Sequence, residues 1–251
     1  MSDIEKLRKL LQDSKRAVVF TGAGISTESG IPDFRSPGGV WDKYKPIYFD
    51  EFLASEEMRR ESWRRKFSVD SKIGKAAPNR GHLAVAQLVK ACKVSHVITQ
   101  NIDNLHQNSG VPPEKIIELH GNATYARCLK CGTRYELEPI REAFLKDETL
   151  PSCTCHPRAI IKTATISFGQ SMPVDAMQEA EEATLGCDLF LAIGSSLVVY
   201  PAAGFPLLAR QNGARLVIIN RDATDLDAEA DVVINAEIGP TLASAVGLNI
   251  T

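Results

Sequence analysis

Short polar motifs stand directly after apolar, strand-like runs of the sequence, and their side chains could bind a nucleotide and react with it. They are Gly22-Ala23-Gly24, Gln100-Asn101-Ile102-Asp103, His120, Gly194-Ser195-Ser196 and Asn220-Arg221-Asp222. Ligands of open α/β sheets bind at the carboxyl ends of the strands. Glycines at such ends let the backbone approach a diphosphate, while amide, carboxylate and hydroxyl groups suit a ribose or a carboxamide. The convergence of these motifs at one sheet edge predicts a nucleotide site.

Each motif has a simpler interpretation when it is taken alone. The pattern G-x-G-x-x-G lacks its third glycine because Thr27 stands there, so a strand-to-helix turn without a ligand stays open. Asn101 and Asp103 could cap a strand end, as these residue types often do in turns. A single histidine such as His120 is usually structural, but at this edge a neutral imidazole could accept a proton from a sugar hydroxyl.

The segment Gly30-Ile31-Pro32-Asp33-Phe34-Arg35 follows the first glycine motif closely. A phenylalanine between an aspartate and an arginine in a loop is poor material for a core, and it is well suited to contact a ligand. We therefore expect Asp33, Phe34 and Arg35 to contribute to the same site.

The elements that would position these residues alternate along the chain. Apolar runs predict strands at residues 17–20, 94–99, 116–119, 188–193, 215–219 and 231–234, and helical spacing predicts helices at 4–15, 82–91, 174–184 and 202–212. Several strands are apolar on both faces, which is typical of a parallel sheet covered by helices. The alternation predicts an α/β fold with a doubly wound parallel sheet.

Two segments interrupt the alternation. Residues 31–81 hold loops with aromatic residues and a charged helical stretch at 56–66, and residues 121–165 hold clustered cysteines and short strand-like pieces such as 133–135. We interpret both as insertions that form a smaller second domain on the α/β core.

The inserted cysteines have the spacing of metal ligands. Cys128 and Cys131 form C-x2-C, a strong half-site because two intervening residues let both thiolates reach one tetrahedral ion. Cys153 and Cys155 form the weaker C-x-C, and His156 is an alternative fourth ligand. Four sulfurs leave no open coordination position, so we expect a structural zinc ion, with unligated thiols as the alternative.

Composition narrows the class of protein. The 251 residues carry 29 basic and 31 acidic side chains, which argues against a dedicated nucleic-acid binder. Neither a signal-peptide pattern nor a run of about 18 apolar residues is visible, so no membrane partner and a cytoplasmic location are expected. A reducing compartment favours metal ligands over disulfides. Cys92 and Cys187, which stand alone in apolar surroundings, are predicted to be core residues.

The ordered motifs resemble the sirtuin family of NAD-dependent protein lysine deacylases, in its bacterial or archaeal form. The resemblance rests on residues 22–26, 30–35, 99–103, 119–121 and the cysteines, and it extends from about residue 15 to 240. It implies a Rossmann-like NAD-binding domain of residues 1–34, 82–120 and 166–251. It also implies a small domain of residues 35–81 and 121–165, in which Cys128, Cys131, Cys153 and Cys155 hold one structural zinc ion.

The resemblance implies the reaction as well. NAD and an acylated lysine of a protein or peptide would meet between the domains, where the acyl oxygen attacks the nicotinamide ribose and an alkylimidate forms. The products would be free lysine, nicotinamide and O-acyl-ADP-ribose. His120 would act as general base on a ribose hydroxyl, and Asn101 and Asp103 would complete the catalytic set. A mono-ADP-ribosyltransferase and a non-catalytic NAD-binding module are the alternatives.

The resemblance also implies roles for residues at positions that match the motifs of the sirtuin family. The expected cofactor-binding residues are Gly22, Ala23, Gly24 and Ser26 at the phosphates, Asp33, Phe34 and Arg35 in the cofactor loop, Gln100, Asn101, Ile102 and Asp103 at the ribose and nicotinamide, and Gly194, Ser195, Ser196, Asn220, Arg221, Asp222 and Ile238 towards the adenosine. Strands through Phe168-Gly169 and Leu197-Val198 would hold the substrate backbone between them, so varied sequences around the lysine should be accepted.

The chain departs from the family pattern at several positions. Its second cysteine pair is shortened by one residue, Thr163 replaces a proline and Gln170 replaces a glutamate. Members that prefer acidic acyl chains carry Tyr-x-x-Arg, which is absent here. Trp63 and Lys66 in the corresponding region are either a substitute for that pair or part of a basic, solvated helix face with one anchoring tryptophan.

Overall fold

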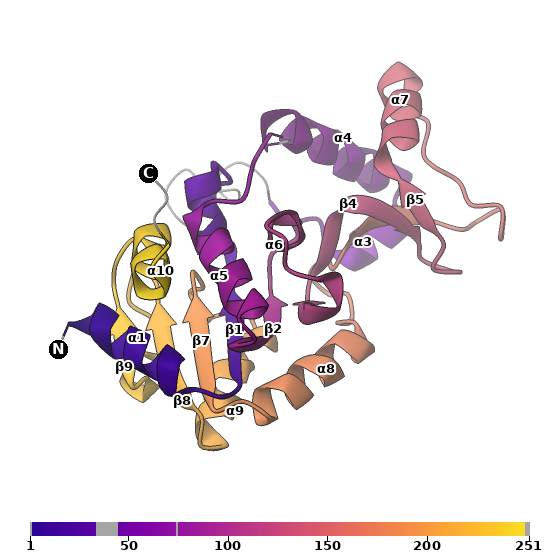
Figure 1. Ribbon diagram of the computed structural model, residues 1–251. Helices are drawn as coiled ribbons and strands as arrows, with labels where there is room; N and C mark the ends of the chain where they lie inside the picture. Colours follow the sequence, from indigo (N-terminus) through magenta and orange to yellow (C-terminus); the bar gives the residue numbers. More distant parts are fainter. Residues whose placement is uncertain (1, 34–44, 74, 249–251) are drawn as a thin grey trace.

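The structure is a computed structural model that describes residues 2–33, 45–73 and 75–248 (Figure 1). Phe34 and Arg35 of the expected cofactor loop lie outside the described residues. In the described part the larger sheet has six strands, all parallel. In spatial order they are β3 (Ile116–Glu118), β2 (Val94–Thr99), β1 (Ala17–Thr21), β7 (Leu189–Ile193), β8 (Arg215–Ile219) and β9 (Val232–Ile234).

The strand order reverses at β1. From β1 the chain builds β2 and β3 towards one edge, then returns to β7 and builds β8 and β9 towards the other. This is the order of a Rossmann-like sheet, in which the ligand crevice lies beyond the carboxyl ends of the strands at the reversal. The predicted α/β class is therefore confirmed, and the site is expected between the ends of β1 and β7.

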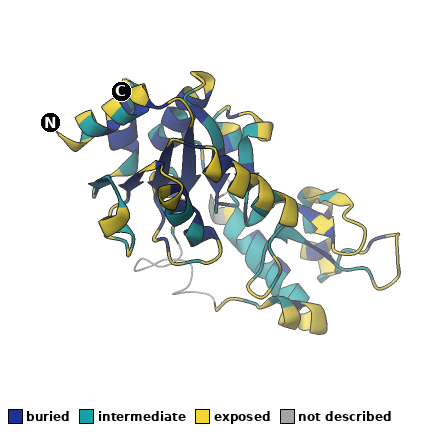
Figure 2. Ribbon diagram, turned by 90° about the horizontal axis from the view of Figure 1, so that it is seen from below, coloured by how far each residue is buried: buried dark blue, intermediate teal, exposed yellow. Residues whose placement is uncertain are grey.

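Helices cover both faces of this sheet (Figure 1). One layer holds α1 (Asp3–Asp13), α5 (Arg80–Lys90) and α10 (Ile238–Val246), and the other holds α8 (Val174–Leu185) and α9 (Phe205–Gln211). The strands pack against both helix layers because alternate side chains point to opposite faces of the sheet. Val19 therefore lies in the core with α1, α5 and α10, and Phe20 lies in the core with α8 and α9. Figure 2 shows the strands as the buried centre of this layered arrangement.

The segment 202–212, predicted as one helix, is divided. A 3-10 turn at Ala202–Gly204 precedes α9, which has Pro206 in its first turn. Proline lacks the N–H that would continue a helix from the preceding turn, so α9 begins afresh next to it.

The two insertions pack together on one side of the sheet (Figure 1). They contain α3 (Phe49–Ala54), α4 (Glu56–Ile73), α7 (Leu137–Asp147) and an antiparallel sheet in the order β5 (Arg134–Glu136), β4 (Gly121–Cys128) and β6 (Ile161–Thr165). The rings of Trp63 and Phe67 on α4 stack with centroids 5.5 Å apart, and Phe67 lies 5.7 Å from Phe144 of α7. The insertions thus share one apolar core, distinct from the two that flank the large sheet.

The two isolated cysteines differ in burial. Cys187 is buried, as predicted, but the prediction that Cys92 is a core residue is wrong, because it is exposed. Cys92 follows the end of α5 with φ 55°, in the left-handed conformation that often terminates a helix and turns the chain into solvent.

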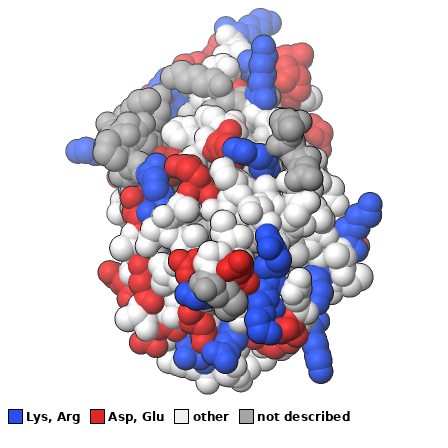
Figure 3. All heavy atoms as spheres, turned by 60° about the vertical axis from the view of Figure 1, so that its left-hand side comes forward, with Lys and Arg blue, Asp and Glu red and all other residues white. Residues whose placement is uncertain are grey.

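Acidic and basic side chains are interspersed over the described part of the face drawn in Figure 3, in agreement with the balanced composition. Among the described residues, none of the helices combines the length and apolar character needed to cross a membrane.

Candidate active site and metal centre

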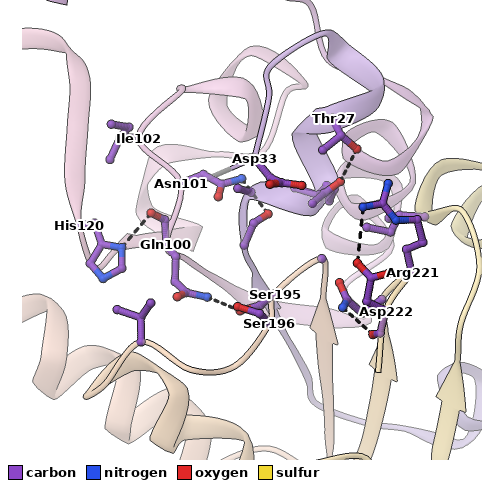
Figure 4. A pocket seen from close by; sticks show the side chains of 18 of the residues that line it. Thr27, Asp33, Gln100, Asn101, Ile102, His120, Ser195, Ser196, Arg221 and Asp222 are labelled. Atoms are coloured by element: carbon purple, nitrogen blue, oxygen red, sulfur yellow. Dashed lines mark hydrogen bonds and ion pairs between the residues drawn. The ribbon is translucent and has the colours of Figure 1, made fainter. Parts of the chain in front are cut away.

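A cavity of about 470 Å³ opens at the carboxyl ends of the parallel strands (Figure 4). Its volume is typical of small-molecule sites. Most of the predicted cofactor and catalytic residues line it: Gly22, Ala23, Gly24, Asp33, Gln100, Asn101, Ile102, His120, Gly194, Ser195, Ser196, Asn220, Arg221, Asp222 and Ile238. The structure therefore brings together residues from five strand ends that are far apart in the sequence.

The glycines after β1 fit closely against the loop after β7. A Cβ atom on Gly22 would lie 2.7 Å from the carbonyl oxygen of Gly194, and one on Gly24 would lie 2.8 Å from the Gly194 Cα. Gly194 itself has φ 63°, and its carbonyl accepts the Gly24 N–H at 2.8 Å. The contact between the two loops thus requires glycine whether or not a diphosphate approaches. The following element, at Ala23–Ser29, is a 3-10 helix.

The ring of His120 is oriented by the end of β2. Its Nδ1 atom lies 3.0 Å from the backbone carbonyl oxygen of Gln100 (Figure 4). A carbonyl can only accept, so Nδ1 carries the hydrogen and Nε2 presents a lone pair. Burial lowers the pKa of His120 below its ordinary value of 6.5, although the bond to Gln100 opposes that shift. His120 is therefore a neutral base at pH 7.

The side chain of Gln100 connects β2 with β7. Its Nε2 donates to the Ser195 Oγ at 2.8 Å, and the same hydroxyl accepts the Leu197 N–H at 3.3 Å. Gln100 is consequently held at its amide by Ser195 while its carbonyl holds His120 (Figure 4). The base and the loop after β7 share one anchor.

Asn101 presents a hydrogen-bond acceptor to the cavity. Its Nδ2 donates to the Gly22 carbonyl at 3.1 Å and to the Ser26 Oγ at 3.2 Å. Both amide hydrogens are thereby engaged, which leaves Oδ1 to accept from a ligand. Ser26 donates in turn to Asp103 at 2.6 Å, and Asp103 accepts the Leu105 N–H at 2.9 Å. Ser26 and Asp103 are outside the cavity lining and lie behind Asn101.

Two of the four predicted peptide-holding residues reach the cavity. Phe168 and Gly169 line it, whereas Leu197 and Val198 do not. The prediction of strands at these positions is wrong: both pairs lie in turns or irregular backbone. Gly169 has φ 80° and Leu197 has φ 55°, and these left-handed values are incompatible with extended chain. Leu197 is also only 3% exposed.

The sequence interpretation missed several lining residues, among them Glu28, Met172, Tyr200, Glu237 and Gly239. Glu28 lies between two recognised motifs, so its position was a usable signal. It pairs with Arg80, and its carboxylate fills the space where a Gly239 side chain would stand, because a Cβ there would lie 1.8 Å from Oε2. No local pattern in the sequence indicates that contact.

The four inserted cysteines form a compact cluster. Their sulfurs all lie within 4.8 Å of one another, with Cys128 and Cys155 at 3.7 Å and Cys131 and Cys153 at 3.6 Å. Sulfurs bound tetrahedrally at 2.3 Å from zinc are about 3.8 Å apart, so the cluster fits one zinc ion. His156 is not in the cluster, and its Nδ1 accepts the Arg158 N–H at 3.1 Å. Cys155 is therefore the fourth ligand that the geometry favours.

Trp63 and Lys66 are not available to an acyl chain. Trp63 is 2% exposed within the small core, and the Lys66 ammonium contacts both carboxylate oxygens of Asp70 one helical turn away. Neither residue lines the cavity. The anchoring interpretation of Trp63 is the one that the structure supports.

Known proteins are similar to this chain over most of its length. A sequence model described as "Sir2 family" matches residues 22–201. The NAD-dependent protein deacetylase of Rhodopseudomonas palustris is 57% identical over 246 residues, which cover 98% of this chain and 97% of the relative. NAD-dependent protein deacetylase 1 of Bradyrhizobium diazoefficiens is 56% identical over 246 residues, covering 98% and 96%.

Solved structures agree with the fold. The Sir2–p53 peptide–NAD+ structure has a TM-score of 0.85 at 34% identity and covers 99% of this chain and 100% of its own. The structure of Sir2Af2 bound to a myristoylated histone peptide has a TM-score of 0.78 at 36% identity, with coverage of 98% and 95%. The family model matches residues 22–201, and the relatives and solved structures cover almost the whole chain, so this chain belongs to the Sir2, or sirtuin, family.

Proposed function

We propose that the protein is an NAD-dependent protein lysine deacylase that releases free lysine, nicotinamide and O-acyl-ADP-ribose. The observation that carries the proposal is a neutral histidine, His120, held at Nδ1 by a backbone carbonyl, in a cavity at the reversal point of a Rossmann-like sheet. Its relatives over nearly the whole chain are NAD-dependent protein deacetylases, which supports the same activity.

His120 and Asn101 would act directly on the bound molecules. NAD supplies an activated ribose carbon from which nicotinamide departs when the acyl oxygen attacks. The free Nε2 of His120 would accept the proton of a ribose hydroxyl, which requires the neutral ring. Asn101 would accept a hydrogen bond through Oδ1, and Asp103 would hold Asn101 through Ser26.

The remaining lining residues would bind and shield the substrates. Gly22, Ala23 and Gly24 would face the diphosphate, while Asn220, Arg221, Asp222 and Ile238 would surround the adenosine. Phe168 at the opposite end would contact the acylated peptide. Its ring lies 6.1 Å from that of Tyr48, and its carbonyl accepts the Phe49 N–H at 2.9 Å, so α3 would steady this contact.

We further propose the division into a Rossmann-like domain (1–34, 82–120 and 166–251) and a small domain (35–81 and 121–165), as the separate core of the insertions supports. The four cysteines would bind zinc that holds this small domain together and supplies no open coordination position. Thiolate ligands suit a reducing compartment, so we place the protein in the cytoplasm.

Incubation with NAD and an acetyl-lysine peptide tests the activity. Mass spectrometry should detect deacetylated peptide, nicotinamide and O-acetyl-ADP-ribose in equal amounts. ADP-ribose attached to protein would instead indicate a mono-ADP-ribosyltransferase. NAD binding without any product would indicate a binding module, and either result would overturn the proposal.

A further inference from the structure

Two buried histidines lie behind the cavity without lining it. His82 of α5 is 0% exposed and His106 of α6 (Leu105–Asn108) is 1% exposed, and their rings meet edge to face with centroids 5.1 Å apart. Neither has a role in the reaction proposed above. Polar side chains are rarely buried so deeply without a specific set of hydrogen-bond partners.

His106 begins a chain of short hydrogen bonds that ends on Asn101. Its Nε2 lies 2.9 Å from the Thr21 Oγ1, which donates to the Thr99 Oγ1 at 2.8 Å. The Thr99 hydroxyl also accepts the backbone N–H of Asn101 at 3.0 Å. Thr21 and Thr99 are the last residues of β1 and β2 and are 0% and 3% exposed. This chain of hydrogen bonds thus joins α6 to the carboxyl ends of β1 and β2, next to the cavity-lining residue Asn101.

The direction of these bonds fixes the form of His106. A hydroxyl has one hydrogen, so Thr21 accepts from Nε2 if it donates to Thr99. Nε2 then carries the ring hydrogen, and Nδ1 is a bare lone pair. Nδ1 is the buried atom for which the described residues offer no partner, so only an acceptor is left unpaired. Burial lowers the pKa of His106 to about 3, which keeps this neutral form in place at working pH.

His82 contacts a residue that holds the side chain of Asn101. Its Nδ1 accepts the Asn79 N–H at the start of α5, and its Nε2 faces the Ser26 Oγ at 3.4 Å. Ser26 accepts from the Asn101 side chain and donates to Asp103. Asn101 is consequently held at its backbone by the His106 chain and at its side chain by Ser26.

We propose that His106 is a positioning residue that acts through Thr21 and Thr99 to fix Asn101, and with it the orientation of the Oδ1 acceptor, in the cavity. The inference rests on the deacylase activity proposed above. It predicts that removing one hydroxyl from the chain misorients Asn101 although no residue that touches a substrate is changed.

A matched pair of variants at Thr21 tests the proposal. Thr21→Val keeps the shape of the side chain but removes the hydroxyl, and Thr21→Ser keeps the hydroxyl. We expect Thr21→Val to lower kcat/KM for NAD at least tenfold with the KM for acetyl-peptide within twofold, because small displacements in a site reduce turnover strongly. Thr21→Ser should stay within threefold of the wild type. Equal activity of the two variants would overturn the proposal.

A double variant separates positioning from general damage. If His106 acts through Thr21, His106→Leu should have little further effect in the Thr21→Val background, whereas independent effects would multiply and contradict the proposal. His96→Gln is the control, because His96 is a partly buried histidine of β2 that takes no part in this chain of hydrogen bonds. The His96→Gln variant should leave kcat/KM unchanged. If Thr21→Val does not fold, His106→Gln and His106→Leu are compared in the same way, and equal kcat/KM values for that pair would reject the positioning role.

Two readouts separate this inference from the proposed function. Turnover by the wild type tests the deacylase activity alone. The ratio of the kcat/KM values of Thr21→Val and Thr21→Ser tests the hydrogen-bond chain from His106 to Asn101. Calorimetry compares the NAD affinity of the same two variants without turnover. A weaker NAD affinity of Thr21→Val together with its lower kcat/KM supports the hydrogen-bond chain, and equal kcat/KM values of the two variants overturn it.

Discussion

The Nδ1 atom of His120 lies 3.0 Å from the carbonyl oxygen of Gln100, and the side chain of that same glutamine donates to Ser195 at 2.8 Å. The general base of the proposed reaction is therefore oriented by the backbone of one strand end and, through one residue, by the loop after another. The first contact fixes which ring nitrogen is basic. The second fixes where the Gln100 backbone itself lies.

Replacing the base should remove turnover and leave cofactor binding. His120→Tyr is expected to lower nicotinamide release driven by acetyl-peptide about 10²- to 10⁴-fold, the usual contribution of a general base. NAD affinity, measured by calorimetry, should change only a few-fold because many other residues line the cavity. His96→Gln serves as the histidine control. Full turnover by the tyrosine variant would show that the base has been misassigned.

The pH dependence of the reaction follows from the burial of His120. A base must be neutral to accept a proton, and burial lowers the pKa of His120 below 6.5. Activity should therefore be constant from pH 8 down to about 6.5 and decline only at lower pH, as the imidazolium forms. The profile of kcat/KM for the peptide measures this limb. A midpoint above 6.5 would contradict the structure.

Much of the site could be predicted because its residues lie in local motifs at strand ends. Gln100, Asn101 and His120 each follow an apolar run, and parallel strands bring such ends to one edge. The contact of Gly22 with Gly194 could not be predicted, since it joins residues from β1 and β7 that only the sheet order makes neighbours. His82 and His106 were missed for the same reason, because their partners come from other elements.

The errors have local physical causes. Cys92 stands among apolar residues, but a left-handed backbone at the end of α5 turns it outward. The family resemblance implied a strand through Leu197, but its φ of 55° prevents an extended conformation. Positive φ at residues other than glycine is set by the surrounding packing, and sequence pattern carries no signal for it.

The metal centre predicts a difference between two adjacent residues. Cys155→Ala should lower zinc content well below one ion per chain and destabilise the small domain, because structural zinc binding is coupled to folding. His156→Ala should keep the zinc, because His156 lies outside the cysteine cluster. Elemental analysis and thermal unfolding of both variants test this. Loss of zinc from His156→Ala alone would reassign the fourth ligand.

Acyl preference should exclude acidic chains. Trp63 is buried in the small core and Lys66 contacts Asp70, so neither offers a hydrogen bond or a charge to a succinyl carboxylate. In a panel of peptides that carry acetyl, propionyl, myristoyl and succinyl groups, the succinyl peptide should have a kcat/KM at least tenfold below that of the acetyl peptide. Lys66→Met should leave this ratio unchanged. A succinyl preference that Lys66→Met abolishes would reverse the assignment.

The buried histidines predict a specific loss of stability in mild acid. Burial lowers the pKa of His82 to about 4 and of His106 to about 3, whereas both titrate near 6.5 in the unfolded chain. Between pH 6.5 and 4 the unfolded state therefore binds more protons than the folded state. The contribution of these histidines to the free energy of unfolding is complete above pH 6.5 and falls as the pH is lowered.

Each of these histidines contributes a slope of about 1.4 kcal/mol per pH unit in the centre of that window. Carboxylates such as Asp188, whose folded pKa lies below 3.8, contribute mainly at lower pH, whereas burial raises the pKa of Glu118 above its ordinary value of 4.5. Glu118 is present in both proteins, so the difference in slope between the wild type and a His106 variant, measured by denaturant unfolding between pH 6.5 and 4.5, isolates the histidine. His106→Gln should be less stable than the wild type at pH 7. The slope of its unfolding free energy against pH should be smaller by about 1.4 kcal/mol per pH unit, which corresponds to one proton. A slope unchanged by this substitution would mean that His106 is protonated in the folded protein, which would leave a buried Nδ1–H for which the described residues offer no acceptor.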